Sequence, residues 1–215
     1  VQIERDIFAA LSAYGPSRVA VCVGSCDNGT ELSFPAHAAF LNGGAFPAGY
    51  TLEVQGADYA ATYVSEKYGI DGPSLAFSTA CSSSAGAIIK AAELLKSGLA
   101  DAVIAGGVDV ASDTVLLGFD SLEAVSPEIT NPLSANRCGI TLGEGAAFFV
   151  MTRDASKGGE PVRLFGWGES ADAYHMTSPD PSGAGAARAM KAALNRAELM
   201  PKQIDYINIF TVKTL

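Results

Sequence analysis

The stretch from Gly72 to Gly98 places the strongest constraint on what this chain can fold into. A short apolar run, Leu75–Phe77, is bounded upstream by Gly72 and Pro73, and this pattern predicts a buried strand. Apolar residues then recur at helical spacing as far as Gly98, a residue type that commonly ends a helix; they are Ile88, Ile89, Ala92 and Leu95. The sequence therefore predicts a strand that turns almost directly into a helix.

Cys81 lies at the predicted turn between this strand and this helix, followed by three serines, 82–84, which are common helix caps. Unpaired N–H groups and the helix dipole at a helix start favour an anion, so a thiol there is biased toward the reactive thiolate. The same N–H groups can hold the oxyanion of a thioester under attack. A small buried thiol is the alternative, and the residues of this stretch leave both interpretations open.

Other segments of the first two thirds of the chain fit an alternating pattern of helices and strands. Continuous apolar runs at Val19–Val23 and Ala102–Ala105 predict strands that are buried on both faces. Helical periodicity is visible from Ile3 to Leu11 and from Ala57 to Tyr68. Strand, helix and strand in this order predict parallel pairing through crossover connections.

The last third of the chain repeats this pattern weakly. One further strand is predicted within Ile140–Thr152, another begins at Val162–Gly168, and a third covers Ile204–Ile209 after a helical segment. Helix, break and strand near the C-terminus echo the same order near the N-terminus. Two similar halves of this kind predict an α/β fold built as a layered sandwich.

Composition and charge exclude several classes of protein. The 215 residues carry a net charge of −9 and Lys and Arg form no run, which argues against binding to nucleic acid. The four cysteines lack the spacing of a zinc or redox pair, and with only two histidines a metal site is not expected. With no signal-peptide pattern and no apolar run long enough to span a bilayer, we expect a cytoplasmic protein that contacts no membrane.

Several ordered motifs resemble one known family. STACSSS at 78–84 is followed by AGGVD at 105–109 and by NPLSANRCGITLGEGAAFFVMTRD at 131–154, and further along by SADAYHMTSPDPSGAG and QIDYIN. Together they resemble the β-ketoacyl-acyl carrier protein synthases, or ketosynthases, of the thiolase superfamily, over about Val19 to Asn208. NPLSANR and SPDPSG are similar to the branch that builds aryl-polyene and other specialised acyl chains.

This resemblance implies a thiolase-like layered α/β/α/β/α sandwich that is incomplete. Residues 1–160 would be the N-terminal half without its first strand, and 161–215 the beginning of the C-terminal half. The chain starts at Val1 without an initiator Met, as a piece of a longer protein would.

The resemblance also implies acyl transfer by decarboxylative Claisen condensation. Cys81 matches the family nucleophile, which takes an acyl group from a carrier protein as a thioester. A malonyl group on a second carrier then loses CO₂, and the resulting carbanion attacks that thioester. No cofactor is implied, because the substrates travel on the phosphopantetheine arm of the acyl carrier protein.

Three further residues match positions that contact substrate in the family. Phe119 matches an aromatic residue that lines the acyl pocket, although an ordinary core aromatic is equally compatible with its sequence context. His175 and Thr177 lie in a loop that borders the entrance for the phosphopantetheine arm. We interpret this loop as a contact for the arm, with His175 as a hydrogen-bonding residue and not as the general base.

The chain departs from the family pattern at Phe210. The family continues after the Tyr-Ile-Asn strand with an aliphatic residue and then His-Gly-Thr, whereas this chain has Phe210 in place of the first catalytic histidine. A phenyl ring can neither donate a hydrogen bond nor carry charge. The unrelated tail 210–215 indicates a truncation or a frameshift, and we expect the 215-residue chain not to condense by itself.

Partners follow from the same resemblance. We expect an acyl carrier protein, and either a homodimer that pairs through the strand Leu75–Ser78 or a complementing subunit. A non-catalytic ketosynthase-like subunit that sets chain length is the alternative, although such subunits usually lack the cysteine that is present here. An enzyme acting on coenzyme A thioesters is a third possibility, and the motifs around His175 and at 131–137 argue for a carrier protein instead.

Overall fold

The computed structural model describes residues 2–153, 162–175 and 178–209. It divides into two compact units, Val1–Glu123 with Leu142–Ser156, and Ala124–Thr141 with Lys157–Leu215. Each unit is described by itself. The predicted division of the sequence at residue 160 concerns the family's halves and stays a prediction.

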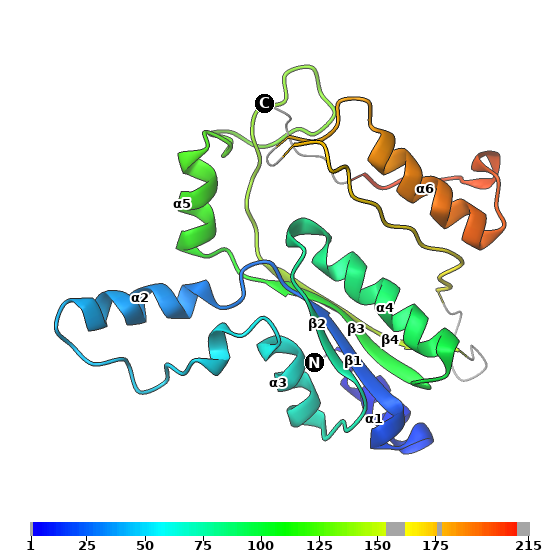
Figure 1. Ribbon diagram of the computed structural model, residues 1–215, viewed down its shortest axis with the longest axis horizontal. Helices are drawn as coiled ribbons and strands as arrows, with labels where there is room; N and C mark the ends of the chain where they lie inside the picture. Colours follow the sequence, from blue (N-terminus) through cyan, green and yellow to red (C-terminus); the bar gives the residue numbers. More distant parts are fainter. Residues whose placement is uncertain (1, 154–161, 176–177, 210–215) are drawn as a thin grey trace. The chain divides into compact units, whose positions relative to one another are not determined.

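The first unit contains a four-stranded sheet in the order β2-β1-β3-β4 (Figure 1). Its strands are β1 (Val19–Gly24), β2 (Ser74–Phe77), β3 (Ala102–Asp109) and β4 (Gly145–Thr152). β1 pairs in parallel with both β2 and β3, which confirms the predicted crossover connections, and β4 pairs antiparallel with β3.

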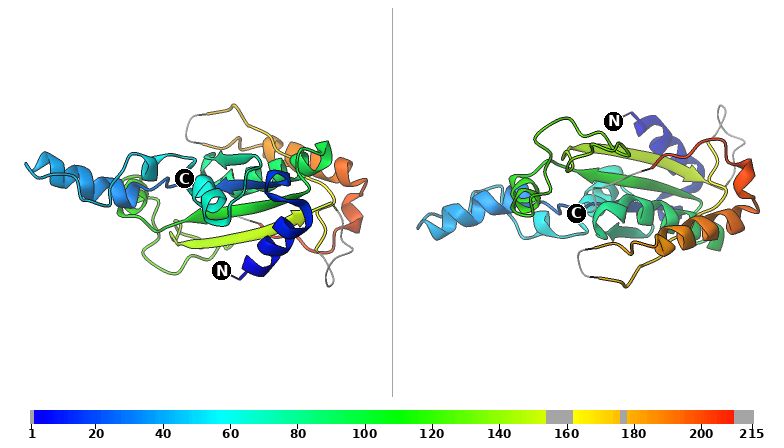
Figure 2. Two further views of the ribbon diagram at one scale, coloured as in Figure 1. Left: turned by 90° about the horizontal axis from the view of Figure 1, so that it is seen from below. Right: turned by 90° about the horizontal axis from the view of Figure 1, so that it is seen from above.

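Helices cover both faces of this sheet, with α4 on one side and α1 on the other (Figure 2). α3 shares the side of α1, because Ala61 belongs to the same buried cluster as Ile7. The helices of this unit are α1 (Glu4–Tyr14), α2 (Thr30–Leu41), α3 (Tyr59–Tyr68), α4 (Ser83–Ser97) and α5 (Asp113–Ser121). Short 3₁₀ turns lie at Pro16–Arg18, Glu53–Gln55 and Ala80–Ser82.

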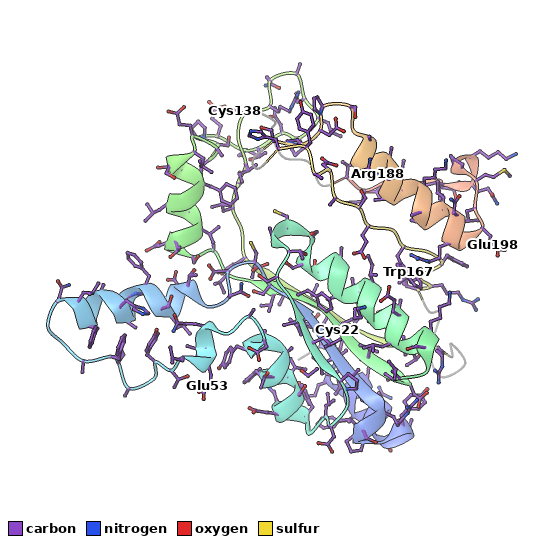
Figure 3. All side chains as sticks on the ribbon, viewed as in Figure 1. Cys22, Glu53, Cys138, Trp167, Arg188 and Glu198 are labelled. Atoms are coloured by element: carbon purple, nitrogen blue, oxygen red, sulfur yellow. The ribbon has the colours of Figure 1, made fainter. Side chains whose placement is uncertain are left out.

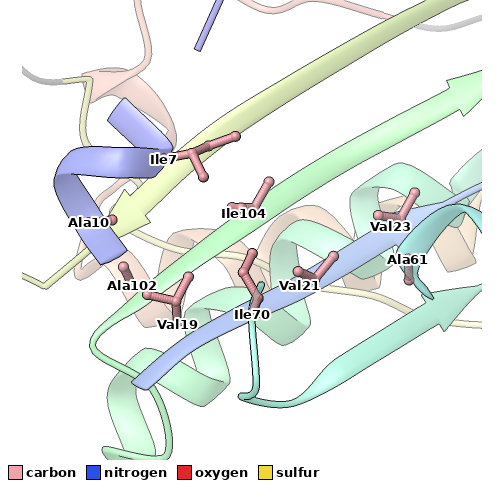
Figure 4. Close-up of a cluster of buried hydrophobic side chains, with 9 residues drawn as sticks. All are labelled: Ile7, Ala10, Val19, Val21, Val23, Ala61, Ile70, Ala102 and Ile104. Atoms are coloured by element: carbon pink, nitrogen blue, oxygen red, sulfur yellow. The ribbon is translucent and has the colours of Figure 1, made fainter. Parts of the chain in front are cut away.

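The two apolar runs predicted as doubly buried strands are β1 and the first half of β3. Successive side chains of a strand point to opposite faces, so each run supplies two cores. Val19, Val21 and Val23 of β1 pack toward α1 and α3 (Figure 4), together with Ile7, Ala10, Ala61, Ile70, Ala102 and Ile104. The alternate residues pack against α4: Ala20, Cys22, Val103 and Ala105 meet Ala87, Ala91, Leu94 and Leu95.

The first turn of α4 lies directly on the backbone of β1 and β3. A Cβ atom built on Gly24 would stand 2.3 Å from the carbonyl carbon of Ser83, and one on Gly107 would stand 2.7 Å from Cβ of Ser84. Neither distance is compatible with any side chain larger than hydrogen, so the two glycines permit this close approach.

β2 differs from its prediction as a buried strand. It is an edge strand that pairs only with β1 among the described residues, and its four positions are exposed or half-buried. Central strands and edge strands can both have a short apolar run, so such a run does not predict whether a strand is buried.

α2 extends away from the sheet (Figure 1), and most of its exposed side chains are apolar. Phe34 is 63% exposed and Leu41 is 81% exposed, and Pro35 lies inside the helix. In its last turn, Phe40 stacks on Phe46 of the following loop at a centroid distance of 4.6 Å, and Phe46 stacks on Tyr50 at 4.9 Å.

The second unit contains α6 (Ala184–Ala197) and a 3₁₀ turn at Pro201–Gln203. The segment before α6 packs tightly on it, since a Cβ on Gly168 would lie 2.1 Å from the carbonyl oxygen of Ala189. Arg196 donates to the carbonyl oxygen of Trp167 at 2.6 Å and stacks over its ring at 4.7 Å.

The strands predicted at Val162–Gly168 and Ile204–Ile209 are not formed in the described parts of these segments. A strand exists only as part of a hydrogen-bonded ladder, and neither segment meets a neighbouring strand here. The predictions were wrong for this reason, because apolar periodicity reports a tendency toward extended backbone and not the presence of a partner. None of the described helices is long and apolar enough to cross a membrane.

We predict that Gly24→Ala destabilises the first unit by more than about 2 kcal/mol, because backbone atoms of α4 would have to move. Gly118→Ala in α5 is the matched control, since nothing lies within 4 Å of its added Cβ. The control should be neutral or stabilising by up to about 1 kcal/mol. Urea unfolding followed by circular dichroism measures both, and a Gly24→Ala variant as stable as the parent would contradict the close approach.

Candidate active site

Cys81 occupies the 3₁₀ turn Ala80–Ser82, which joins the end of β2 to the start of α4. The strand, the turn and the helix lie where the sequence predicted them, and the helix ends at Gly98 in the left-handed conformation. The thiol of Cys81 is exposed, so the alternative of a buried core cysteine does not describe this residue.

The serines of this turn bond backward and not as helix caps. Ser83 donates to the carbonyl oxygen of Ala80 at 2.6 Å and accepts from the N–H of Thr79 at 2.9 Å. Ser82 donates to the carbonyl oxygen of Thr79 at 2.8 Å, and as N-cap of α4 it makes no side-chain cap hydrogen bond. The prediction that these serines cap the helix was wrong. Their hydroxyls close the turn, and Ser82 gives the first-turn amides of α4 no side-chain cap.

Ala80, the residue immediately before the thiol, has a φ of +54°. This left-handed conformation costs a residue with a Cβ about 1 kcal/mol, and such strain concentrates at functional sites. The hydrogen bonds of Ser82 and Ser83 to the same turn hold it there. This strain could not be predicted, because alanine is not a residue that favours positive φ.

Asp109 organises the loop that faces this turn from the end of β1. One oxygen of Asp109, Oδ1, accepts from the N–H of Cys26 at 2.6 Å, the N–H of Asp27 at 3.0 Å and the hydroxyl of Ser25 at 3.2 Å. Three donors on one carboxylate oxygen fix the loop to the end of β3. The AGGVD motif did not predict this role for Asp109. The role depends on the pairing of β1 with β3, which brings Asp109 beside the loop after β1.

A second polar group ties the same loop to α2 and α5. Ser112 is fully buried, donates to Oδ1 of Asp27 at 2.8 Å, and caps α5 by accepting from the N–H of Val115 at 3.2 Å. Thr30, the first residue of α2, donates to the same oxygen of Asp27. Strand ends and two helix starts thus share one hydrogen-bonded network.

A cavity of about 570 Å³ opens on the α1 and α3 side of the sheet. Its walls are mostly apolar, with Tyr59, Tyr63 and Phe148 among them, and it reaches Asp27 and Asp109 at the strand ends. Cys81 is not part of its lining, because the turn that carries the thiol leads into the helix on the opposite face.

Of the other predicted site residues, the structure describes Phe119 and His175. Phe119 is half-buried on α5 and belongs to neither core cluster. His175 is exposed and lies in the second unit, which is described separately. Thr177 and Phe210 lie outside the described residues. Their proposed roles remain predictions from the family resemblance.

The remaining cysteines differ sharply in environment. Cys22 is buried against α4 (Figure 3), and burial raises the pKa of its thiol to about 12, so it stays protonated and unreactive. Cys26 and Cys138 are exposed, and Cys138 belongs to the second unit. Within the part of the chain that the structure describes, no three His, Cys, Asp or Glu residues are grouped to hold a metal ion.

Comparison with known proteins agrees with this geometry. The family model "Beta-ketoacyl synthase, N-terminal domain" matches residues 9–157, and "Beta-ketoacyl synthase, C-terminal domain" matches residues 163–212. The 3-oxoacyl-[acyl-carrier-protein] synthase 2 of Coxiella burnetii is 35% identical over 226 residues, covering 99% of this chain and 54% of that protein. The enzyme of the same name from Vibrio cholerae is 31% identical, covering 100% and 55%.

Solved structures give the same picture. The ketosynthase ApeO from Xenorhabdus doucetiae, in complex with its chain length factor ApeC, matches with a TM-score of 0.88 and 35% identity, over 94% of this chain and 50% of that one. A β-ketoacyl synthase from Burkholderia phymatum matches with a TM-score of 0.77 and 28% identity, over 91% and 52%.

The sheet with helices on both faces and the likeness to these solved ketosynthases assign the chain to the thiolase fold. The chain belongs to the β-ketoacyl synthase family, as the sequence motifs predicted. It spans about half the length of the curated relatives that it matches.

We predict that Ala80→Gly costs little stability. Glycine adopts the left-handed conformation without strain, and this gain offsets the larger conformational entropy of glycine in the unfolded chain. Ala9→Gly is the matched control, at an exposed position inside α1, and it should cost about 1 kcal/mol. Chemical denaturation of both variants tests this difference. Equal losses of stability would show that the turn before Cys81 stores no strain.

Proposed function

We propose that this chain is the acyl-accepting part of a 3-oxoacyl-carrier-protein synthase, in fatty-acid or polyketide-like biosynthesis. The observation that carries the proposal is the exposed Cys81 thiol in the turn between β2 and α4, in a chain of the β-ketoacyl synthase family. The names of the relatives support the reaction class, since several are 3-oxoacyl-[acyl-carrier-protein] synthases and one, from Streptomyces virginiae, is a putative polyketide β-ketoacyl synthase.

The proposed first step is transfer of an acyl group to Cys81. Its sulfur attacks the carbonyl carbon of the acyl thioester on the carrier, a bond from sulfur to carbon forms, and the phosphopantetheine thiolate leaves. The negative charge that develops on the carbonyl oxygen would be held by first-turn amides of α4, which have no side-chain cap. The step needs no resident cofactor, because the carrier's arm brings the acyl group.

The second step in the family is condensation, in which a malonyl thioester loses CO₂ and the carbanion displaces the Cys81 thiolate from its acyl group. We propose that this 215-residue chain does not complete that step. Phe210 stands where the family motif has a histidine, and a phenyl ring cannot stabilise the oxyanion of the enolate. His175 and Thr177 are proposed to contact the carrier's arm, and Phe119 to line the acyl pocket.

The outer edge of β2 is the proposed site of subunit contact. The carbonyl of Pro73 accepts from Val21 of β1 at 2.8 Å, and that of Phe77 accepts from Ser25, the residue after β1, at 3.0 Å. The alternate residue Ala76 therefore directs its backbone polar groups toward the open edge. An unpaired edge of this kind pairs readily with another strand. A second copy of this chain is the proposed partner, and a complementing subunit is the alternative, as the solved complex of ApeO with a chain length factor suggests.

We predict that an acyl-carrier protein bearing a medium-length acyl thioester transfers its acyl group to Cys81 of the purified chain. Intact-protein and peptide mass spectrometry should find the adduct on the peptide that contains Cys81. Cys81→Ala should lose it, and Cys138→Ser, in the second unit, should keep it. Addition of malonyl-carrier protein should yield no extended product.

Two outcomes would overturn parts of this proposal. Absence of any adduct, with binding of the carrier or a ketosynthase partner intact, would favour a non-catalytic ketosynthase-like subunit. Formation of an extended acyl chain by the isolated chain would contradict the role assigned to Phe210.

We predict that the chain sediments as a dimer and that Ala76→Pro shifts it toward the monomer, because proline removes the N–H at the open edge while leaving the bonds to β1. Ser74→Arg, a charge on the same edge, should act in the same direction. Analytical ultracentrifugation at several concentrations measures the shift, with circular dichroism as the check on folding. A parent chain that stays monomeric at high concentration would refute the edge as a self-association site.

A further inference from the structure

A second exposed thiol, Cys26, lies in the loop that follows β1. It comes two residues after Gly24, the glycine on which the first turn of α4 rests. Of the cysteines in the first unit, only Cys22 is buried, and both Cys26 and Cys81 are exposed.

Three contacts join the segment 24–28 to the segment 77–83. The Gly24 backbone lies against the Ser83 backbone, the N–H of Ser25 donates to the carbonyl oxygen of Phe77 at 3.0 Å, and the Asn28 amide donates to the Ser78 hydroxyl at 2.9 Å. Along the sequence, Cys26 lies between Ser25 and Asn28 of the first segment, and Cys81 lies between Ser78 and Ser83 of the second. Both thiols are therefore confined to adjacent turns at the same end of the sheet.

The position of Cys26 is fixed from behind by β3. Its N–H donates to Asp109 at 2.6 Å, and that carboxylate also holds the neighbouring N–H of Asp27. Burial raises the pKa of the Cys26 thiol, and the charges of Asp109, Cys81 and Asp27 raise it further. The bond to Asp109 and the three contacts between the segments 24–28 and 77–83 hold Cys26 in the turn beside the one that carries Cys81.

We propose that Cys26 is a resolving thiol that closes a reversible disulfide with Cys81 under oxidation. Hydrogen peroxide is the oxidant by class: the Cys81 thiolate attacks one peroxide oxygen, giving a sulfenic acid and releasing hydroxide. The sulfur of Cys26 then attacks the sulfur of Cys81, the S–S bond forms, and the Cys26 proton leaves with the hydroxyl as water. Two electrons pass from the pair of sulfurs to peroxide, and a dithiol reductant returns them.

The chemical consequence is protection of Cys81. A sulfenic acid with no thiol beside it is oxidised further to a sulfinic acid, which common thiol reductants do not reverse. A neighbouring thiol diverts it to a disulfide that can be reopened. If the proposed function holds, the disulfide also prevents Cys81 from accepting an acyl group, because its sulfur is no longer a free thiol. Formation of the disulfide itself does not depend on that function.

Its test uses the reduced full chain treated with hydrogen peroxide and quenched with N-ethylmaleimide, followed by non-reducing digestion and mass spectrometry. We expect a linked pair of peptides that contain Cys26 and Cys81, restored to free thiols by dithiothreitol. Cys26→Ser should form no such link and should accumulate sulfinic acid on Cys81 several-fold faster. Cys138→Ser is the matched control and should behave like the parent chain; Cys26→Ala, with circular dichroism as a folding check, replaces Cys26→Ser if the latter does not fold.

Failure of this inference and failure of the proposed function give different results. Links from Cys81 to Cys138, links only between chains, or equal sulfinic acid in the parent and in Cys26→Ser would overturn the resolving role while leaving acylation of Cys81 intact. A Cys26–Cys81 link in a chain that takes no acyl group would leave the resolving role standing and refute acyl transfer. Prior acylation should block the link, because both reactions require the same sulfur.

Discussion

The close contact between the first turn of α4 and the backbones of β1 and β3 is the constraint on which the rest of the first unit depends. It requires hydrogen in place of a side chain at Gly24, which faces the Ser83 backbone, and at Gly107, which faces Cβ of Ser84. Because the helix start rests on two strands at once, the turn that carries Cys81 has a fixed position relative to the ends of both strands. The hydroxyls of Ser82 and Ser83 then close the turn on this packed backbone.

At the ends of β1 and β3, hydrogen bonds between polar groups hold the loops in place. Asp109 collects three donors from the loop after β1, while Ser112 and Thr30 hold Asp27 and with it the starts of α5 and α2. Buried apolar side chains pack along β1 and the first half of β3, so the two central strands are held by their cores and the loops at their ends by hydrogen bonds. This division suits a site whose loops must present groups to a substrate while the strands stay in register.

Much of the first unit could be predicted from its sequence, since continuous apolar runs define β1 and β3, and helical spacing defines α1, α3 and α4. The position of Cys81 at the strand-to-helix turn was predictable for the same reason. The left-handed Ala80, the backward bonding of Ser82 and Ser83 and the three bonds to Asp109 were not, because each depends on contacts between segments far apart in the sequence. Burial of β2 and pairing of the segments at 162–168 and 204–209 failed for a related reason: a sequence states that a segment can pair but not whether a partner is present.

The exposed apolar surface of α2 has a consequence for how such a chain behaves in solution. Phe34 and Leu41 on α2 and the open edge of β2 belong to the same unit, and covering them with another chain would bury apolar area that a lone copy leaves in water. Wherever such covering occurs, association and folding become linked equilibria, and the measured melting temperature rises with protein concentration. Stability is then a property of the assembly at a stated concentration and not a constant of the single chain.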